Sequence, residues 1–221
     1  MKIARLATST LTAVMAVGLA VSSVASAAPL IGPVGTTLQG TSGTGILRVA
    51  GETLTCAKDT STGTITSSTL IGGLRVHFLD CTAKNAAGAE CPVMSTGAPL
   101  SNLILTNVLH GVLGLILPKP TSGSDVALVL LPVSGSAFYN LLGTCFANLS
   151  VSGQIAGLVL PVNISSTTGR LDFGVTGGVQ NITDVDLSTG GLVKPKLTAG
   201  SEPITEETTE EIEFSEKVEV M

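Results

Sequence analysis

The sequence predicts an all-β protein: a single-domain β-sandwich, Ig-like or Greek-key, with a β-barrel as the runner-up. Two observations support this prediction. Short apolar runs rich in Val, Leu, Ile and Thr are separated by Gly, Ser and Pro along most of the chain. In addition, no segment keeps apolar residues at helical spacing for three turns with a polar opposite face.

The first 27 residues have the features of a secretory signal peptide. Lys2 and Arg5 give a positive start, an apolar stretch covers residues 11–21, and an A-x-A end occupies residues 25–27. The apolar stretch is too short to span roughly 30 Å of hydrocarbon. We therefore expect an exported protein, secreted or associated with the cell surface, with a mature chain beginning near Ala28.

The mature chain is expected to begin with a flexible leader, residues 28–43, because this stretch is rich in Gly, Pro and Thr. A β-rich domain then covers residues 44–221. Residues 45–51 and 52–56 predict a hairpin that turns at Gly51, and 63–69 predicts a further strand.

Residues 74–81 alternate most clearly. Leu74, Val76 and Phe78 face one side, and Arg75 and His77 face the other.

The most apolar run of the mature chain, residues 103–117, is too short for a membrane helix, which needs roughly 20 residues. Gly111 and Gly114 interrupt it, and Gly is a poor helix former. We expect strands at 102–108 and 112–117 with a turn or bulge at 109–111, and no transmembrane segment in the mature chain.

Two similar runs, residues 125–133 and 153–162, have strand lengths. Residues 112–117 and 126–131 do not alternate, so both faces of these strands are apolar. Something must cover the second face. The candidates are another part of the same chain, a second copy, a partner or an envelope surface.

The C-terminal part begins with two alternating strand candidates, 169–175 and 182–188. The tail, residues 201–221, contains eight of the sixteen acidic residues. Its EETTEE segment is expected to be a solvated or disordered loop. Residues 212–220 alternate again and predict an acidic edge strand, whose charges discourage edge-to-edge pairing.

An even number of cysteines in an exported protein favours disulfides. Loop length favours Cys81–Cys91 together with Cys56–Cys145, and Cys56–Cys81 with Cys91–Cys145 is the close alternative. A zinc site lacks the C-x-x-C spacing and nearby His ligands. The four disulfide candidates are Cys56, Cys81, Cys91 and Cys145.

Composition argues against several classes of function. Without Lys2 and Arg5, nine basic residues face sixteen acidic ones, so phosphate-driven nucleic-acid binding is disfavoured. Aromatic residues make up 3 % of the chain and Trp is absent. This scarcity weighs against a carbohydrate-binding or enzyme cleft built on aromatic platforms.

The sequence has no recognisable catalytic motif. His77 and His110 are the two histidines, and neither lies in a G-x-S-x-G, H-E-x-x-H or P-loop pattern. Asp184, Asp186 and Asn181 have oxygen ligands at calcium-like spacing, but the loop motif is incomplete. We therefore assign no catalytic, cofactor-binding or metal-binding residue and expect no cofactor.

The order of short motifs is distinctive. ETLTC, GTITSST, VHFLDC, AECP, LTNVLHGVLG, DVALVLLPVSGSAF, VSGQIAGLVLPVN and EETTEEIEFSEKVEV follow one another. Over about residues 40–221 this order resembles a family of uncharacterised secreted, cysteine-containing β-rich proteins of actinobacteria. The resemblance implies export and a β-rich fold with cysteines, and it implies no activity, ligand or catalytic residue.

Three functional hypotheses follow. The first is a non-enzymatic secreted or cell-surface protein acting in adhesion, envelope structure or self-assembly. The second is an extracellular module that binds a small apolar ligand or a glycan. The third is a hydrolase, which needs His77 or His110 within hydrogen-bonding distance of a Ser or Asp.

Overall fold

The computed structural model describes residues 27–49, 52–84, 88–143 and 147–221. Residues 1–26, which hold nearly all of the expected signal peptide, and Gly51 lie outside the described residues. Every regular element in the described ranges is a strand, which confirms the all-β prediction. The strands are β1 (Ile31–Gly32), β2 (Thr37–Ser42), β3 (Gly45–Val49), β4 (Glu52–Ser67), β5 (Leu70–Lys84), β6 (Glu90–Ser95), β7 (Ile104–Leu105), β8 (Leu109–Ile116), β9 (Val126–Pro132), β10 (Ala137–Gly143), β11 (Leu149–Gly153), β12 (Ile155–Leu160), β13 (Ser166–Phe173), β14 (Val175–Thr176), β15 (Val179–Gln180), β16 (Val185–Leu187), β17 (Leu192–Val193), β18 (Leu197–Ala199) and β19 (Glu202–Val220).

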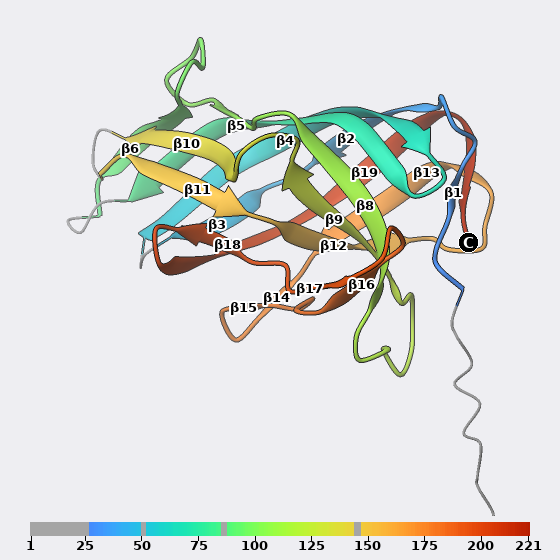
Figure 1. The fold of residues 1–221 in the computed structure, drawn as a ribbon. Coiled ribbons are helices and arrows are strands. Elements are labelled where there is room, and N and C mark those ends of the chain that lie inside the picture. Colours follow the sequence, from blue (N-terminus) through green and yellow to red (C-terminus); the bar gives the residue numbers. More distant parts are fainter. Residues whose placement is uncertain (1–26, 50–51, 85–87, 144–146) are drawn as a thin grey trace, which may run out of the picture.

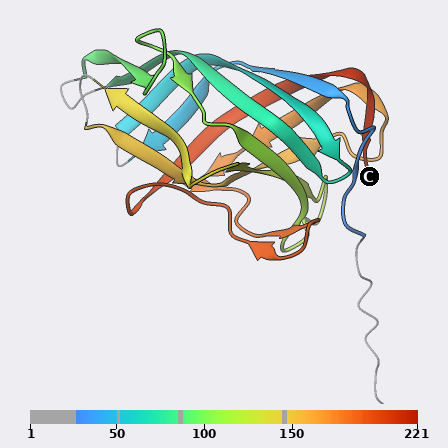
Figure 2. The same ribbon diagram turned by 45° about the horizontal axis from the view of Figure 1, so that its top comes forward.

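Seventeen of these strands form one antiparallel sheet, and β14 and β15 form a separate two-stranded sheet. The large sheet wraps partly round its interior (Figures 1 and 2). The predicted sandwich of two separate sheets is therefore replaced by one continuous sheet. The reason is the length of β4, β5 and β19, which run through the whole sheet and link strands that would otherwise belong to different layers.

The three long strands have different neighbours at their two ends. Towards one end they pair with β3, β6 and β18, and β10 and β11 complete the sheet between β6 and β18. Towards the other end they pair with β2, β8 and β13, and β9 and β12 complete the sheet between β8 and β13. The predicted strands at 52–56 and 63–69 are thus parts of one strand, β4, and Val49 pairs with Glu52 as the predicted hairpin requires.

The expected flexible leader at 28–43 is part of the sheet. β1 pairs with β19, and β2 lies between β19 and β4. Its Thr residues favour a strand, and Leu38 is buried in the core. The prediction of a loose segment was wrong because composition carries no information about these distant partners.

The C-terminal strand is central rather than an edge. β19 pairs with β2 and β3 on one side and with β13 and β18 on the other. Its EETTEE segment, expected to be a loop, is extended throughout. The tail does belong to the domain, as predicted, but its acidic side chains do not protect a free edge.

The apolar run at 103–117 contains β7 and the whole of β8. The predicted break at 109–111 was wrong, because these residues belong to β8 and pair with β9, while the interruption falls at residues 106–108. β6 and β10 were not predicted at all. Within the described part of the chain, no helix is long and apolar enough to cross a membrane.

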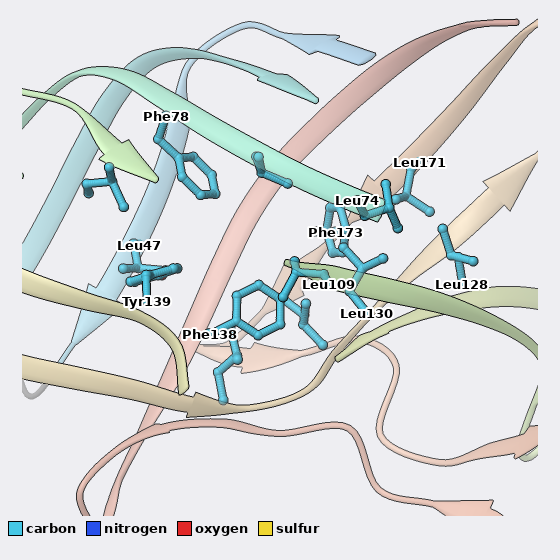
Figure 3. Close-up of a cluster of buried hydrophobic side chains, with 14 of the residues drawn as sticks. Leu47, Leu74, Phe78, Leu109, Leu128, Leu130, Phe138, Tyr139, Leu171 and Phe173 are labelled. Atoms are coloured by element: carbon cyan, nitrogen blue, oxygen red, sulfur yellow. The ribbon is translucent and has the colours of Figure 1, made fainter. Parts of the chain in front are cut away.

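The main core lies inside the wrapped sheet. Figure 3 shows Leu47, Phe78, Leu109, Leu171 and Phe173 pointing into it from β3, β5, β8 and β13. A register shift in β10 helps bury two consecutive aromatic residues, Phe138 and Tyr139. Their rings meet edge to face with centroids 6.0 Å apart, and the Phe78 ring lies 6.1 Å from that of Tyr139.

The second apolar face of β8 and β9 is covered by the chain itself. Val185 and Ile182 pack over Ile116, Ala127 and Val129 in a second, smaller core. β16 approaches β8 closely at Gly114, where a Cβ would lie 2.7 Å from the Asp186 carbonyl oxygen. Of the candidates left open by the sequence, a segment of the same chain is the one that covers this face.

One disulfide joins Cys56 to Cys81. These residues are register partners on β4 and β5, with Cα atoms 4.0 Å apart. The pairing favoured by loop length, Cys81–Cys91, was therefore wrong, because strand register rather than sequence separation sets which thiols meet. Cys91 is buried on β6, and Cys145 lies outside the described residues.

Candidate functional site

The inner face of β19 carries acidic side chains into the protein interior. Along residues 206–212 burial alternates, so Glu206, Thr208 and Glu210 face inward while Glu207, Thr209 and Glu211 are exposed. Glu206 and Glu210 are 7 % and 6 % exposed. Carboxyl groups are almost never buried to this degree without a partner, which makes this segment the most unusual feature of the fold.

Asp59 adds a third buried carboxyl group from β4. It accepts a hydrogen bond from the Ser42 hydroxyl on β2, and its own backbone N–H donates to Ser42 Oγ at 3.0 Å. Burial raises the pKa of Asp59, and the Ser42 hydrogen bond partly opposes that rise. Asp59 Oδ1 has no hydrogen-bond partner within the described part of the chain.

Glu210 lies beside Gly40 and Ser61. A Cβ at position 40 would collide with the Glu210 carboxyl group and the Ser61 hydroxyl, so the absent side chain of Gly40 leaves the space that both occupy. Burial raises the pKa of Glu210 to about 7, a hydrogen bond from Ser61 opposes the rise, and the charge of Asp59 adds to it.

Glu206 has the most apolar surroundings of the three. With Leu47, Cys56, Phe78 and Tyr139 among its neighbours, it lines a hollow of about 10 Å³, roughly the space of one water molecule. Burial raises its pKa to about 8, with further contributions from the charges of Asp59 and Glu210. The pKa of Tyr139 is also raised, by burial first and then by Glu206.

We call Asp59, Glu206 and Glu210 the interior carboxyl cluster. The four ion pairs among the described residues all lie elsewhere, so no Lys or Arg neutralises this cluster. The described residues also contain no group of three or more acidic, His or Cys side chains arranged to hold a metal ion. What the cluster can do is hold protons at neutral pH, because the uncharged acid is the form that a buried site favours.

The small hairpin β14–β15 lies beside the cluster, against the edge of β19 between β18 and β13. The Gln180 side chain donates to the Glu206 carbonyl at 3.1 Å and accepts from the Glu206 N–H at 3.2 Å. It also donates to the Gly174 carbonyl at 3.1 Å. On this side of β19, pairing with β18 ends at Ile204 and pairing with β13 begins at Thr208, so the Gln180 amide replaces a neighbouring strand.

A groove of about 370 Å³ lies beneath the hairpin, and we call it the hairpin groove. Its apolar wall includes Ile155, Leu197 and Ile204, which are buried, and Val179 of the hairpin, which is exposed. The remaining lining residues are Gln154, Gly178, Gln180, Thr183, Asp184, Lys194, Pro195, Lys196, Pro203 and Thr205.

A more polar hollow of about 430 Å³ lies on the other side of the hairpin. Its lining includes Thr208, Glu207 and the β2–β3 connection at Gly43 and Thr44. It therefore reaches β19 between the two buried glutamates. Thr208 is buried, and its hydroxyl has no hydrogen-bond partner in the described ranges.

The histidines are not brought into either hollow. His77 is exposed on β5, on the outward side as predicted, and lies opposite Leu105 and Thr60 in the sheet. His110 is half-buried on β8, and burial lowers its pKa. Within the described residues, neither imidazole forms a hydrogen bond with a Ser, Asp or Glu side chain, so the hydrolase hypothesis gains no support from geometry.

The three residues considered for calcium do not converge. Asp184 forms an ion pair with Lys194 at 3.6 Å and accepts a hydrogen bond from Thr183 at 2.9 Å. Asp186 is exposed on β16, and Asn181 is exposed with its side-chain amide next to Gly174.

Sequence reasoning missed the interior carboxyl cluster completely. Glu206, Thr208 and Glu210 stand at every second position, which is the one signal that could have shown them sharing a strand face. Since Glu207 and Glu211 alternate with them, the sequence does not indicate which glutamates face inward.

No family model, curated protein or solved structure matches this chain. The resemblance predicted from the motif order is thus shown only in its coarser part, a β-rich protein with a disulfide.

Proposed function

We propose that this protein is an exported, non-enzymatic module that binds a small amphipathic molecule in the hairpin groove. The observation that carries the proposal is the groove itself, with a volume of about 370 Å³ and buried apolar residues beside a few polar groups. Small-molecule sites are typically concave, mostly apolar and roughly 300–1,000 Å³ in volume.

The protein interior is a poorer candidate for the same role. The apolar hollow at one end of the main core, lined by Leu38, Leu113 and Leu128 among others, holds about 40 Å³. That volume suits one or a few water molecules rather than an organic ligand. The proposal therefore places the ligand outside the sheet, under β14–β15, rather than inside it.

Export belongs to the proposal as well. The Cys56–Cys81 disulfide supports it, because disulfides persist in oxidising compartments outside the cytosol. The basic, apolar and small-residue pattern of residues 1–27 supports it independently. That the chain belongs to a family of secreted actinobacterial proteins is likewise part of the proposal.

The test is a thermal-shift screen of small amphipathic compounds on the oxidised chain. Thr183→Trp should abolish any stabilisation because the indole would occupy the groove, which Thr183 lines. Thr167→Trp is the control, since Thr167 is exposed on β13 and lines none of the hollows described above. Hits that survive Thr183→Trp, or a screen without hits, would count against the groove as the site.

A second candidate function is a surface role in adhesion, envelope structure or self-assembly. One observation favours it: Leu30 and Met221 exchange backbone hydrogen bonds of 3.0 and 2.9 Å, and Asn163 bonds the neighbouring Val220 carbonyl. Leu30, Ile164 and Met221 thus gather exposed apolar side chains at one end of the molecule. Size-exclusion chromatography and cell fractionation test this role; a monomer found only in the medium would contradict it.

A further inference from the structure

The hairpin groove has basic side chains beside its apolar wall. Lys194, Lys196 and Asp184 line it, and Lys194 Nζ lies 3.6 Å from Asp184 Oδ1. Lys196 is exposed and has no ion pair with any described residue. One ammonium group therefore remains unneutralised at the groove, in a chain whose net charge is −5.

The backbone fixes the position of Lys196 relative to the apolar wall. The Gln154 N–H donates to the Lys196 carbonyl at 3.1 Å, which ties the start of β18 to the junction of β11 and β12. Leu197 follows directly and is buried, with Ile155 and Ile204 beside it in the lining. A cationic group and an apolar wall thus stand next to each other in one groove.

We propose that the ligand is a small amphipathic carboxylate, with its anionic head at Lys196 and its apolar chain along Ile155, Leu197 and Val179. This inference rests on the proposed function and specifies its ligand class. A cation would be repelled by Lys196, and a strongly polar ligand would leave the exposed Val179 side chain without apolar contacts. A single anionic head matches the single unneutralised ammonium.

The test compares sodium decanoate with 1-decanol, which has the same chain and no charge, by isothermal titration calorimetry. Decanoate should bind the wild-type protein more tightly than decanol. Lys196→Gln should weaken decanoate binding roughly tenfold or more, as expected for loss of a charge-assisted contact, and leave decanol binding unchanged. Lys58→Gln, an exposed change on β4 that alters net charge equally, should have no effect.

Salt adds an independent measurement. Decanoate binding to the wild type should weaken between low and physiological ionic strength, because exposed charges are screened, and binding to Lys196→Gln should respond less. Equal affinity for decanoate and decanol, or an unaffected Lys196→Gln variant, would overturn the carboxylate assignment. If Thr183→Trp still abolishes binding in that case, the groove remains the binding site. If neither probe nor any other compound binds in the groove, the proposed function fails as well.

Discussion

Glu206→Gln should make the protein more stable at neutral and alkaline pH. The folded chain holds this carboxyl group in an apolar environment that raises its pKa to about 8, whereas the ordinary value is 4.5. Gln has nearly the same shape and carries no charge, so the variant keeps the packing and removes the ionisation.

The direction follows from proton linkage. Between pH 4.5 and 8 the folded state binds a proton at Glu206 that the unfolded state has released, so stability falls as the pH rises through this range. At roughly 1.4 kcal/mol per pH unit, the loss is about 3 kcal/mol at pH 7 and about 5 kcal/mol above pH 8. Below pH 4.5 both states are protonated and no loss occurs. Glu210, with a pKa raised to about 7, and Asp59, also raised, act in the same direction.

The assay is urea unfolding of the wild type and Glu206→Gln at several pH values from 4 to 9. The stability difference between them should be small at pH 4 and grow towards pH 8 in favour of the variant. Glu207→Gln is the matched control: its side chain is 46 % exposed and pairs with Arg48 at the surface, so it should change little. A difference that stays constant with pH would refute the reasoning, because no ionisation would then be involved.

Three further predictions concern the framework around the site. Gly40→Ala should lower the free energy of unfolding by roughly 1–3 kcal/mol, since the new methyl group collides with the Glu210 carboxyl group and the Ser61 hydroxyl. Gly43→Ala is the control: a Cβ at this position has no neighbouring atom within 4 Å, so it should cost far less in the same urea titration. The double change Cys56→Ala and Cys81→Ala should lower stability by about 2–4 kcal/mol, and an unchanged unfolding midpoint would show that this bridge contributes nothing. Gln180→Ala should speed protease cleavage at Gly177–Gly178, because three hydrogen bonds that hold the hairpin are lost. Gln39→Ala, an exposed change on β2, is the control. Equal cleavage rates for the two variants would contradict the role given to Gln180.

Local patterns predicted the strands whose burial alternates or whose apolar runs are bounded by breakers. Leu74, Val76 and Phe78 face the core while His77 faces outward, as expected. The runs at 125–133 and 153–162 are β9 and β12. Such patterns succeed because the side-chain period of a strand is a property of neighbouring residues.

The same patterns failed where a distant segment decides the outcome. The apolar outer face of β8 and β9 left open whether the same chain, a second copy, a partner or an envelope surface covers it, and Val185, more than 50 residues further along the chain, is what covers it. The EETTEE segment looks solvated, yet β2, β3 and β13 hold it in the middle of a sheet. Its Thr residues favour strands, and its position between neighbours overrides the low strand preference of Glu.

The sequence by itself determined the class of fold, because the period of two and the spacing of breakers are local and repeat along the chain. The tertiary structure alone decided which of two adjacent glutamates is buried, which cysteines meet and where the groove lies. A shift of one residue in the register of β19 exchanges its two faces without changing its composition. Register is set by hydrogen bonds to strands as far away as Gly40 and Leu47, and no local pattern records those partners.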